Sequence, residues 1–455
     1  MSLLGAFAAG CASGRSLPAG PALVHALDPP SPWSAPVDAQ RPVEARLPVD
    51  VPLTRKVFPS SGLSYNDAAL AALALNPRLR AIRAQRGVAH AQIVQAGILP
   101  NPEFGGSLDI PTDGSLAGTG KGYSAWLAWA ITPLISRHAA VSAERKNLSA
   151  VELDIAWQEW QVVQAARLGV VRLAELQLLL SIARETAAAL EAKVAAIQGA
   201  VKTGDATVLE LSSAQSTLQA ASLEVLQLVQ AQRVTRLAWL RAIGVPPTSS
   251  LDVSAKPGLP DYRTLPDLQA LLDALPEHRF DLVGLRKGYD AQDARVRAAA
   301  LNGFPPVTVG INRAVDTGKV GTVGFAVTIG LPVLDRNQGN RKLAAATREQ
   351  LQGAYLSRVQ QARSEVATAY ANLRSVQEQL ALVRASVPTL EELVTVSEQM
   401  VGGGNVNIVN LYDLKLRLLN AQLLAERLHQ NELELGVALE LAACVSLGSI
   451  VEEIP

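Results

Sequence analysis

The chain has 455 residues, 41 basic and 41 acidic side chains, and a formal net charge of +0 at pH 7. Charged residues make up 18% of it, and a neutral balance without basic runs argues against nucleic-acid binding. The two cysteines, Cys11 and Cys444, exclude a disulfide framework, and the five histidines show no metal-ligand spacing. Because there is no phosphate loop, nucleophile motif or metal triad, the sequence predicts neither an enzyme nor a bound cofactor.

The amino terminus reads as a secretion signal followed by a tether. Residues 1–11 form a short apolar run that ends in Ala8, Ala9, Gly10 and Cys11, which resembles the end of a bacterial lipoprotein signal. On this interpretation Cys11 is acylated and attaches the chain to a membrane. The alternative is an apolar terminus with an idle cysteine. Residues 12–62 are rich in proline, which predicts an extended tether.

A first structural repeat covers residues 63–243. A helix begins at Ser64, where Asp67 three residues later indicates a capping box, and Pro77 separates it from a second helix. Apolar residues then alternate with small or polar ones, which is the period of a strand, before the period becomes helical. The remaining predicted elements are strands over 102–110 and 122–131, a long helix over 133–201, a tip turn, and a helix over 205–243.

The same order of elements recurs in residues 267–445, after a proline-rich linker over 244–266. Pro332 matches Pro133 at the end of a strand, and Gly404 matches Gly204 at the end of a long helix. The recurrence of these prolines and glycines in order indicates an internal duplication. The second set consists of strands over 306–315 and 320–331, a long helix over 332–401, a tip turn, a helix over 405–443, and a tail over 446–455.

The four strands have one apolar face and one polar or small face, as lipid-facing barrel strands do. No apolar run is long enough to cross a bilayer as a helix, so any membrane insertion must come from these strands. Four strands cannot close a barrel, and open edges are not tolerated in lipid. Several chains must therefore share one barrel. The alternative is a pair of ordinary amphipathic hairpins on a soluble core.

Two pairs of motifs resemble the TolC family of outer-membrane efflux proteins. They are the glycine turns VKTGDATVLEL and VGGGNVNIVNL, and the proline exits ITPLISR and LPVLDRNQG. The second exit resembles the CzcC-like branch, which exports heavy-metal cations. The resemblance implies a mainly α fold with a membrane β-barrel. In it a homotrimer shares a twelve-stranded barrel in outer-membrane lipid, above a long α-helical periplasmic tunnel.

The resemblance also implies partners and site residues. The tunnel would dock onto a periplasmic adaptor that leads to an inner-membrane pump of the resistance-nodulation-division type, and the channel itself would be a passive duct. The periplasmic tips that meet the adaptor would contain Val201, Gly204, Asp205, Val401 and Gly404. The transition from barrel to tunnel would contain Pro133, Pro332 and Asp335.

The pore entrance is expected just beyond the second tip, where the family often has carboxylates that favour cations. The matching positions are Asn410 and Asp413, three residues apart on one helix face, and Glu210 is their counterpart in the first repeat. Three copies of Asp413 around an axis would concentrate cations, whereas a solvated surface carboxylate is the alternative. The cargo is expected to be divalent metal ions. The same channel type could instead serve multidrug efflux or type I secretion, and a soluble coiled-coil scaffold is the remaining alternative.

Overall fold

The computed structural model describes residues 62–112, 114, 118–402 and 408–447. The predicted lipidation site Cys11, most of the tether, Gly404 and the end of the tail lie outside these residues. The elements are α3 (Tyr65–Leu75), α4 (Pro77–Gly97), β1 (Glu103–Asp109), β2 (Gly122–Ala130), α5 (Thr132–Thr203), α6 (Val208–Ile243), α7 (Leu268–His278), α8 (Phe280–Leu301), β3 (Val307–Val315), β4 (Gly321–Ile329), α9 (Gln338–Gly402) and α10 (Ile408–Ala443).

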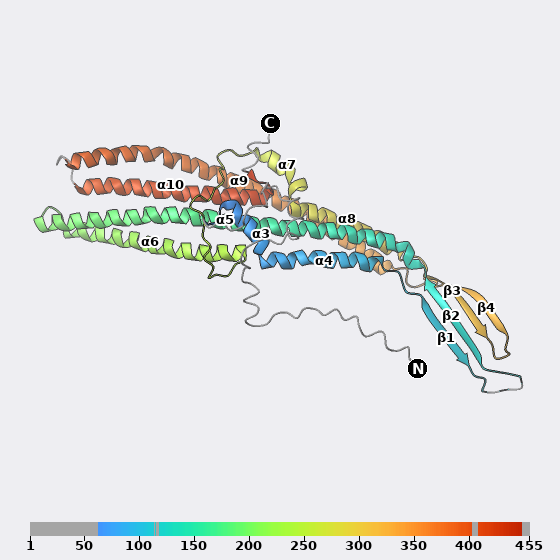
Figure 1. Cartoon of the computed structure of the whole chain (residues 1–455). Helices are drawn as coiled ribbons and strands as arrows, with labels where there is room; N and C mark the ends of the chain where they lie inside the picture. The colour runs from blue at the N-terminus through green and yellow to red at the C-terminus, as the bar shows by residue number, and fades with distance from the viewer. Residues whose placement is uncertain (1–61, 113, 115–117, 403–407, 448–455) are drawn as a thin grey trace.

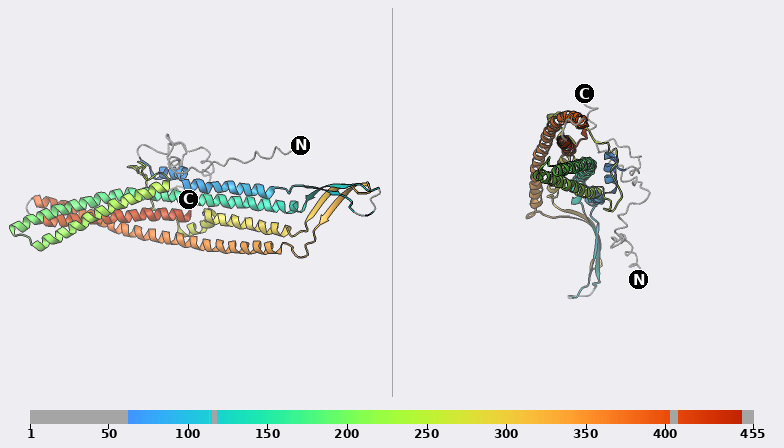
Figure 2. Two further views of the ribbon diagram at one scale, coloured as in Figure 1. Left: turned by 90° about the horizontal axis from the view of Figure 1, so that it is seen from below. Right: turned by 90° about the vertical axis from the view of Figure 1, so that its left-hand side faces the viewer.

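The chain forms a long rod with the strands at one end and two helical hairpins at the other (Figure 1). Helix α5 has 72 residues and α9 has 65, so at about 1.5 Å per residue each is roughly 100 Å long. In the half of the rod away from the strands, α6 runs back along α5 and α10 along α9. In the other half α4 lies beside α5 and α8 beside α9, and the sheet leaves the helices at an angle (Figure 2).

Short polar caps set several helix starts. The expected capping box of α3 is present, with the Asp67 amide donating to Ser64 Oγ at 3.2 Å and the Ser64 amide donating to the Asp67 carboxylate at 3.4 Å. The Asn76 side chain caps α4, and Pro77 occupies the first turn, where its missing amide proton costs nothing. The four strands lie inside the four ranges that the sequence predicts.

The second long helix begins later than expected. The sequence predicts a helix from Pro332, whereas α9 starts at Gln338, so Pro332 is outside it. A tight turn occupies the intervening residues. The Asn337 amide donates to Asp335 Oδ1 at 2.8 Å, and Asn337 itself has a φ of 61°. Helical backbone cannot continue through a left-handed residue, and asparagine is one of the few side chains that tolerates that conformation.

The main hydrophobic core lies midway along the rod. Helix α3, the 244–266 segment and α7 pack there against the long helices, with Trp239, Leu240 and Leu433 fully or almost fully buried. The proline-rich linker is therefore a packed part of the core. Val253 forms a parallel β-bridge with Leu63, and Tyr262 is buried. This belt joins the two repeats and holds the amino-terminal part of the described chain against the linker.

Two buried arginines make polar contacts within this region. Arg279 pairs with Asp281 at 2.9 Å and with Glu365 at 2.7 Å, and its Nη1 donates to the Ala442 carbonyl at 2.9 Å. Arg167 Nη1 lies 3.8 Å from Glu440 Oε2, and burial raises the pKa of the Glu440 carboxyl. Because a buried charge needs partners, these contacts fix how the helix ends meet at the middle of the rod.

Candidate functional site

The strands form one antiparallel sheet in the order β1-β2-β3-β4, and its register sorts the side chains into two faces. Leu127, Ile311 and Phe325 stand opposite one another across β2, β3 and β4. They belong to a face of large apolar side chains that are exposed on this chain, including Phe325 at 89% and Phe104 at 78%. A continuous exposed apolar face of this kind suits contact with lipid.

The opposite face is polar or small. Ser107 and Ser124 face each other there with their hydroxyl oxygens 3.0 Å apart. The large exception is Trp126, whose ring lies over Gly105, where an added Cβ would come within 2.4 Å of it. The other polar residues of this face are Glu103, Asp109, Thr308, Asn312, Thr322 and Thr328. The face could therefore line a water-filled lumen.

The edges of the sheet explain why one chain is not enough. β1 and β4 are the outer strands, and within the described residues neither has a partner strand on its outer side. In lipid each unpaired backbone group costs several kcal/mol, so a sheet with an apolar face must close on itself or on other copies. The shallow arc of four strands in Figure 1 is a segment of a barrel that needs further strands.

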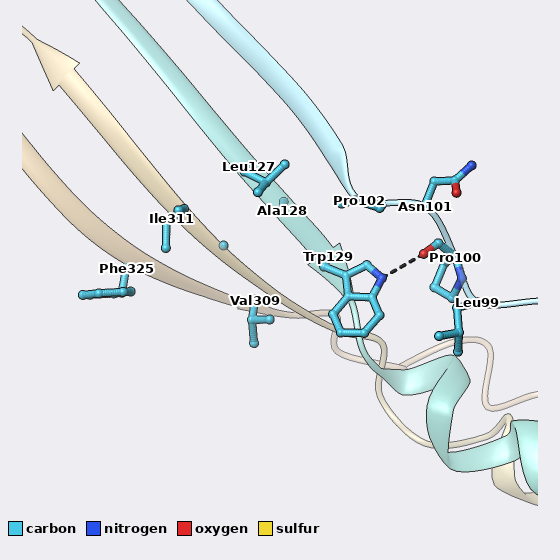
Figure 3. A pocket seen from close by; sticks show the side chains of 11 residues that line it. Leu99, Pro100, Asn101, Pro102, Leu127, Ala128, Trp129, Val309, Ile311 and Phe325 are labelled. Carbon is cyan, nitrogen blue, oxygen red and sulfur yellow. Dashed lines mark hydrogen bonds between the residues drawn. The ribbon is translucent and has the colours of Figure 1, made fainter.

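A hollow of about 720 Å³ lies on the apolar face at the end nearest the helices. Figure 3 shows Trp129 at its edge, with the indole nitrogen donating to the Pro100 carbonyl at 2.8 Å. The hollow is lined by Leu127, Val309, Ile311 and Phe325 from the sheet. A tryptophan with an apolar body and a satisfied N–H is typical of the boundary between hydrocarbon and water.

The transition from sheet to helices differs between the repeats. Pro133 lies in the first turn of α5, as expected, and the Thr132 hydroxyl accepts from the Val307 amide at 2.6 Å. In the second repeat the chain passes from Pro332 through the Asp335 turn before α9 begins. Both exits lie at the same end of the sheet, so Pro133, Pro332 and Asp335 all lie where the strands meet the long helices.

At the first tip, Gly204 ends α5 with a φ of 85°, a conformation that suits glycine. Its amide donates to the Val201 carbonyl at 3.3 Å, and the Asp205 amide donates to the Ala200 carbonyl at 2.8 Å. The Asp205 carboxylate accepts from the Thr203 hydroxyl at 2.6 Å. Capping thus closes this tip into a defined turn. At the second tip Val401 belongs to the last turn of α9, and the turn itself is outside the described residues.

Glu210 caps the start of its own helix, α6. Its Oε2 accepts from the Thr207 amide at 2.7 Å and from the Thr207 hydroxyl at 2.9 Å, and these bonds hold the pKa of the Glu210 carboxyl below its usual value. The pair forms a capping box, so α6 starts at Val208, three residues later than the sequence predicts. The carboxylate keeps its charge but is turned back onto its own helix.

Asp413 is paired across the two hairpins. Its Oδ1 lies 2.5 Å from the Lys193 ammonium of α5, whereas Asn410, one turn earlier on α10, is exposed. Two further ion pairs join the hairpins higher along the rod, one between Arg172 and Glu434 and the other between Arg427 and Glu224. Lys193 is the residue that sequence reasoning missed. Helical spacing shows which residues share one helix face, but it does not show which helix lies opposite.

Exposed apolar residues beside the first tip were also missed. Val208 and Leu209 open α6 and are 71% and 80% exposed. Below them Val201, Leu211 and Val409 pack on a small core of Val194, Ile197 and Ala214, which joins the hairpins close to the tips. The sequence signal was the placement of two large apolar residues directly after a turn. The result is a packed tip whose surface carries exposed apolar side chains.

The described residues contain no group of three or more histidine, cysteine or acidic side chains arranged to hold a metal ion. None of the helices in the described part of the chain is both long enough and apolar enough to span a membrane. Cys444 is buried, and burial raises the pKa of its thiol to about 12.

Comparison with known proteins assigns the family. The sequence model of the outer membrane efflux protein family matches residues 70–245 and 271–443. A search of curated proteins gives no significant match. Among solved structures, CusC is 19% identical with a TM-score of 0.66, covering 91% of this chain and 99% of CusC. The outer-membrane channel OprN is 17% identical with a TM-score of 0.68, covering 92% and 98%.

The outer membrane protein VceC of Vibrio cholerae is 19% identical with a TM-score of 0.66, covering 84% of this chain and 96% of VceC. At these sequence identities the similar structures show only that the fold is shared. The match to the family model is what assigns the chain to a family. Both the family match and the structural likenesses are consistent with the open sheet, the long helices and the paired tips described above. The resemblance that the glycine turns and proline exits indicated is confirmed: the chain belongs to the outer membrane efflux protein family, whose members are passive trimeric channels and not enzymes.

Proposed function

We propose that three copies of this chain form an outer-membrane channel that exports divalent heavy-metal cations. The tunnel receives them from a periplasmic adaptor and an inner-membrane pump of the resistance-nodulation-division type. The observation that carries the channel assignment is the sheet, which has an apolar face, a polar face and two open edges. Three such sheets supply the twelve strands of one barrel, with the polar faces turned inward.

The cation cargo is supported by the LPVLDRNQG motif and by the position of Asp413. In a trimer, three Asp413 carboxylates near the tips lie around one axis and attract cations. Lys193 holds each carboxylate when the hairpins are together, so the attraction is strongest when the hairpins separate. The proposed entrance thus contains Asp413, with Asn410 on the same helix and Glu210 held at the first tip.

The adaptor is proposed to bind the tips. The Gly204 turn presents Val208 and Leu209 to solvent, and the small core beneath keeps their spacing fixed. Apolar side chains on a rigid turn suit a protein partner better than a small molecule. Acylation of Cys11 would add a lipid anchor to the outer membrane, and the proline-rich residues that follow would span the distance to the described body.

A second cargo class has a specific observation in its favour. Because Lys193 neutralises Asp413, the closed entrance carries less negative charge than the sequence suggests. Multidrug efflux or type I secretion would suit a weakly charged duct. A soluble scaffold does not fit, because the large apolar side chains of the sheet would then face water.

The deciding experiment is a growth-inhibition panel on a strain that lacks the protein, complemented with wild type, Asp413→Asn or an empty vector. The panel contains cobalt, zinc, cadmium, nickel and copper salts beside detergents, dyes and antibiotics. Sensitivity confined to one or two metals and restored by wild type supports cation efflux. Sensitivity to dyes and antibiotics with unchanged metal tolerance overturns the cargo and retains the channel.

A further inference from the structure

The apolar face of the sheet carries a single charged residue. Arg313 stands between Ala125 of β2 and Val323 of β4, and all three belong to the face that presents Leu127, Ile311 and Phe325. Arg313 is exposed. Among the described residues no carboxylate lies within ion-pair distance of it. A charged side chain on a lipid-facing surface is costly at the middle of the bilayer and much less so near its boundary.

The position of Arg313 along the strand is near that boundary. β3 ends at Val315, so Arg313 lies about 7 Å from the end of the strand that is remote from the helices. Tyr123 pairs with Val315 beside it and is 56% exposed. A tyrosine next to an arginine at the end of an apolar band is the pattern of a membrane–water interface. The long Arg313 side chain can extend along the strand towards water.

Two lysines continue the positive charge beyond the strands. Lys121 directly precedes β2 and is two residues before Tyr123, so it lies at the end of the strand that is remote from the helices. Lys319 belongs to the β3–β4 turn, and its Cε would lie 3.3 Å from a Cβ added to Gly120, so it lies against the residue that precedes Lys121. Both lysines are exposed. The three cations thus come from β3 and from two different loops.

The acidic residues that the structure describes near this rim are turned elsewhere. Asp316 closes the β3–β4 turn, where its Oδ1 accepts from the Val320 amide at 2.9 Å. Asp109 belongs to the polar face of β1. The apolar face itself has no acidic residue on any of its four strands. Arg313 therefore has no negative charge to match it on the apolar face, and Lys121 and Lys319 add positive charge at the rim beyond it.

We propose that Arg313, Lys121 and Lys319 form a binding surface for a phosphate-bearing glycolipid of the outer leaflet of the outer membrane. The acyl chains would lie along the apolar face, and Arg313 and the two lysines would contact the phosphates from below and above. Guanidinium and ammonium groups are the side chains that pair best with phosphate. Each trimer would present three such surfaces. The inference rests on the proposed orientation, with the loops outside the cell, and is independent of the cargo.

The test uses the full-length channel purified in detergent, with bound lipid counted by native mass spectrometry. The probes are diphosphoryl lipid A and the same lipid without its phosphates. Wild type is expected to retain lipid A, and the variant Lys121→Gln, Arg313→Gln, Lys319→Gln is expected to bind it at least about tenfold more weakly. Lys256→Gln, an exposed charge removed from the distant linker, is the matched control and is expected to bind as wild type does.

Heat-modifiable gel mobility confirms that each variant still forms the trimer. Arg313→Lys, which keeps the charge, is expected to retain most of the binding. Equal binding of the triple variant and wild type overturns the proposal, as does equal binding of the dephosphorylated lipid or a failure of wild type to bind lipid A. If the triple variant loses lipid binding but the cells keep normal metal tolerance, lipid binding at the rim is independent of export. The growth panel measures export through the channel and does not measure lipid binding.

Discussion

The Lys193 ammonium of α5 lies 2.5 Å from Asp413 Oδ1 of α10, so an ion pair joins the two helical hairpins close to their tips. The Lys193 side chain is 17% exposed and that of Asp413 is 48% exposed. At such a partly exposed site a pair contributes on the order of 0–1 kcal/mol. That is small for folding, but three copies acting together can bias the opening of a channel.

The first prediction concerns this pair. Lys193→Gln leaves Asp413 charged and unpaired, so single-channel conductance in planar bilayers and the preference for cations over anions should both rise, by up to about fivefold. Asp413→Asn should abolish the added cation preference. Lys415→Gln is the control, because Lys415 pairs with Glu398 at 2.6 Å within one hairpin. A Lys193→Gln channel with wild-type conductance and selectivity would contradict a role for the pair at the entrance.

The second prediction concerns the buried charge at the middle of the rod. Arg279→Met removes one of two arginines that pair with Asp281 and Glu365, since Arg358 contacts both carboxylates, and should lower the free energy of unfolding by about 1.5–3 kcal/mol. Thermal unfolding of the purified trimer, followed by circular dichroism, measures the loss. Arg286→Gln removes an exposed pair with Glu277 and should change the Tm little. Equal Tm values for the two variants would show that the Arg279 contacts do not stabilise the fold.

The third prediction tests how the linker is held. An added Cβ on Gly436 of α10 would lie 2.1 Å from the Tyr262 ring, so Gly436→Ala should destabilise the fold by about 1–3 kcal/mol. In a Tyr262→Ala background the same change should cost little, because the ring is gone. Gly353→Ala is the control, since nothing lies within 4 Å of that position. Additive losses in the double variant would rule out direct contact between Gly436 and Tyr262.

The fourth prediction is a pH dependence. The hydrogen bond of His429 Nδ1 to Glu432, at 3.3 Å, raises the pKa of His429 above its ordinary 6.5, with burial opposing it. Glu175 of α5 raises this pKa further, and Arg384 of α9 lowers it. Because the folded pKa is the higher one, this contribution to stability is complete below pH 6.5 and is lost as the pH rises through the folded pKa.

The Tm of wild type between pH 5.5 and 8.5 should therefore fall more steeply than the Tm of His429→Gln. His90→Gln serves as the control, since His90 is exposed on α4 and lies far from this cluster in the sequence. Parallel curves for wild type and His429→Gln would mean that protonation of His429 does not stabilise the fold.

The sequence was informative wherever a local pattern determines local structure. Ser64 and Asp67 make the expected capping box, Pro133 begins α5, and Gly204 ends it in the left-handed conformation. The alternation of apolar residues predicted the four strands, because side chains two residues apart share a face whatever the sheet pairs with. The late start of α9 was missed, because the Asp335 turn depends on several short hydrogen bonds that a helical period does not reveal.

The sequence by itself determined the duplication, the order of the helices and the two faces of each strand, since these depend on neighbours within a few residues along the chain. Only the tertiary structure decided which residues meet across the rod. It placed Lys193 against Asp413, packed Tyr262 on Gly436, and gathered Arg313, Lys121 and Lys319 at one rim. These contacts join residues far apart in sequence, and they depend on how long helices and strands lie beside one another, which periodicity alone does not specify.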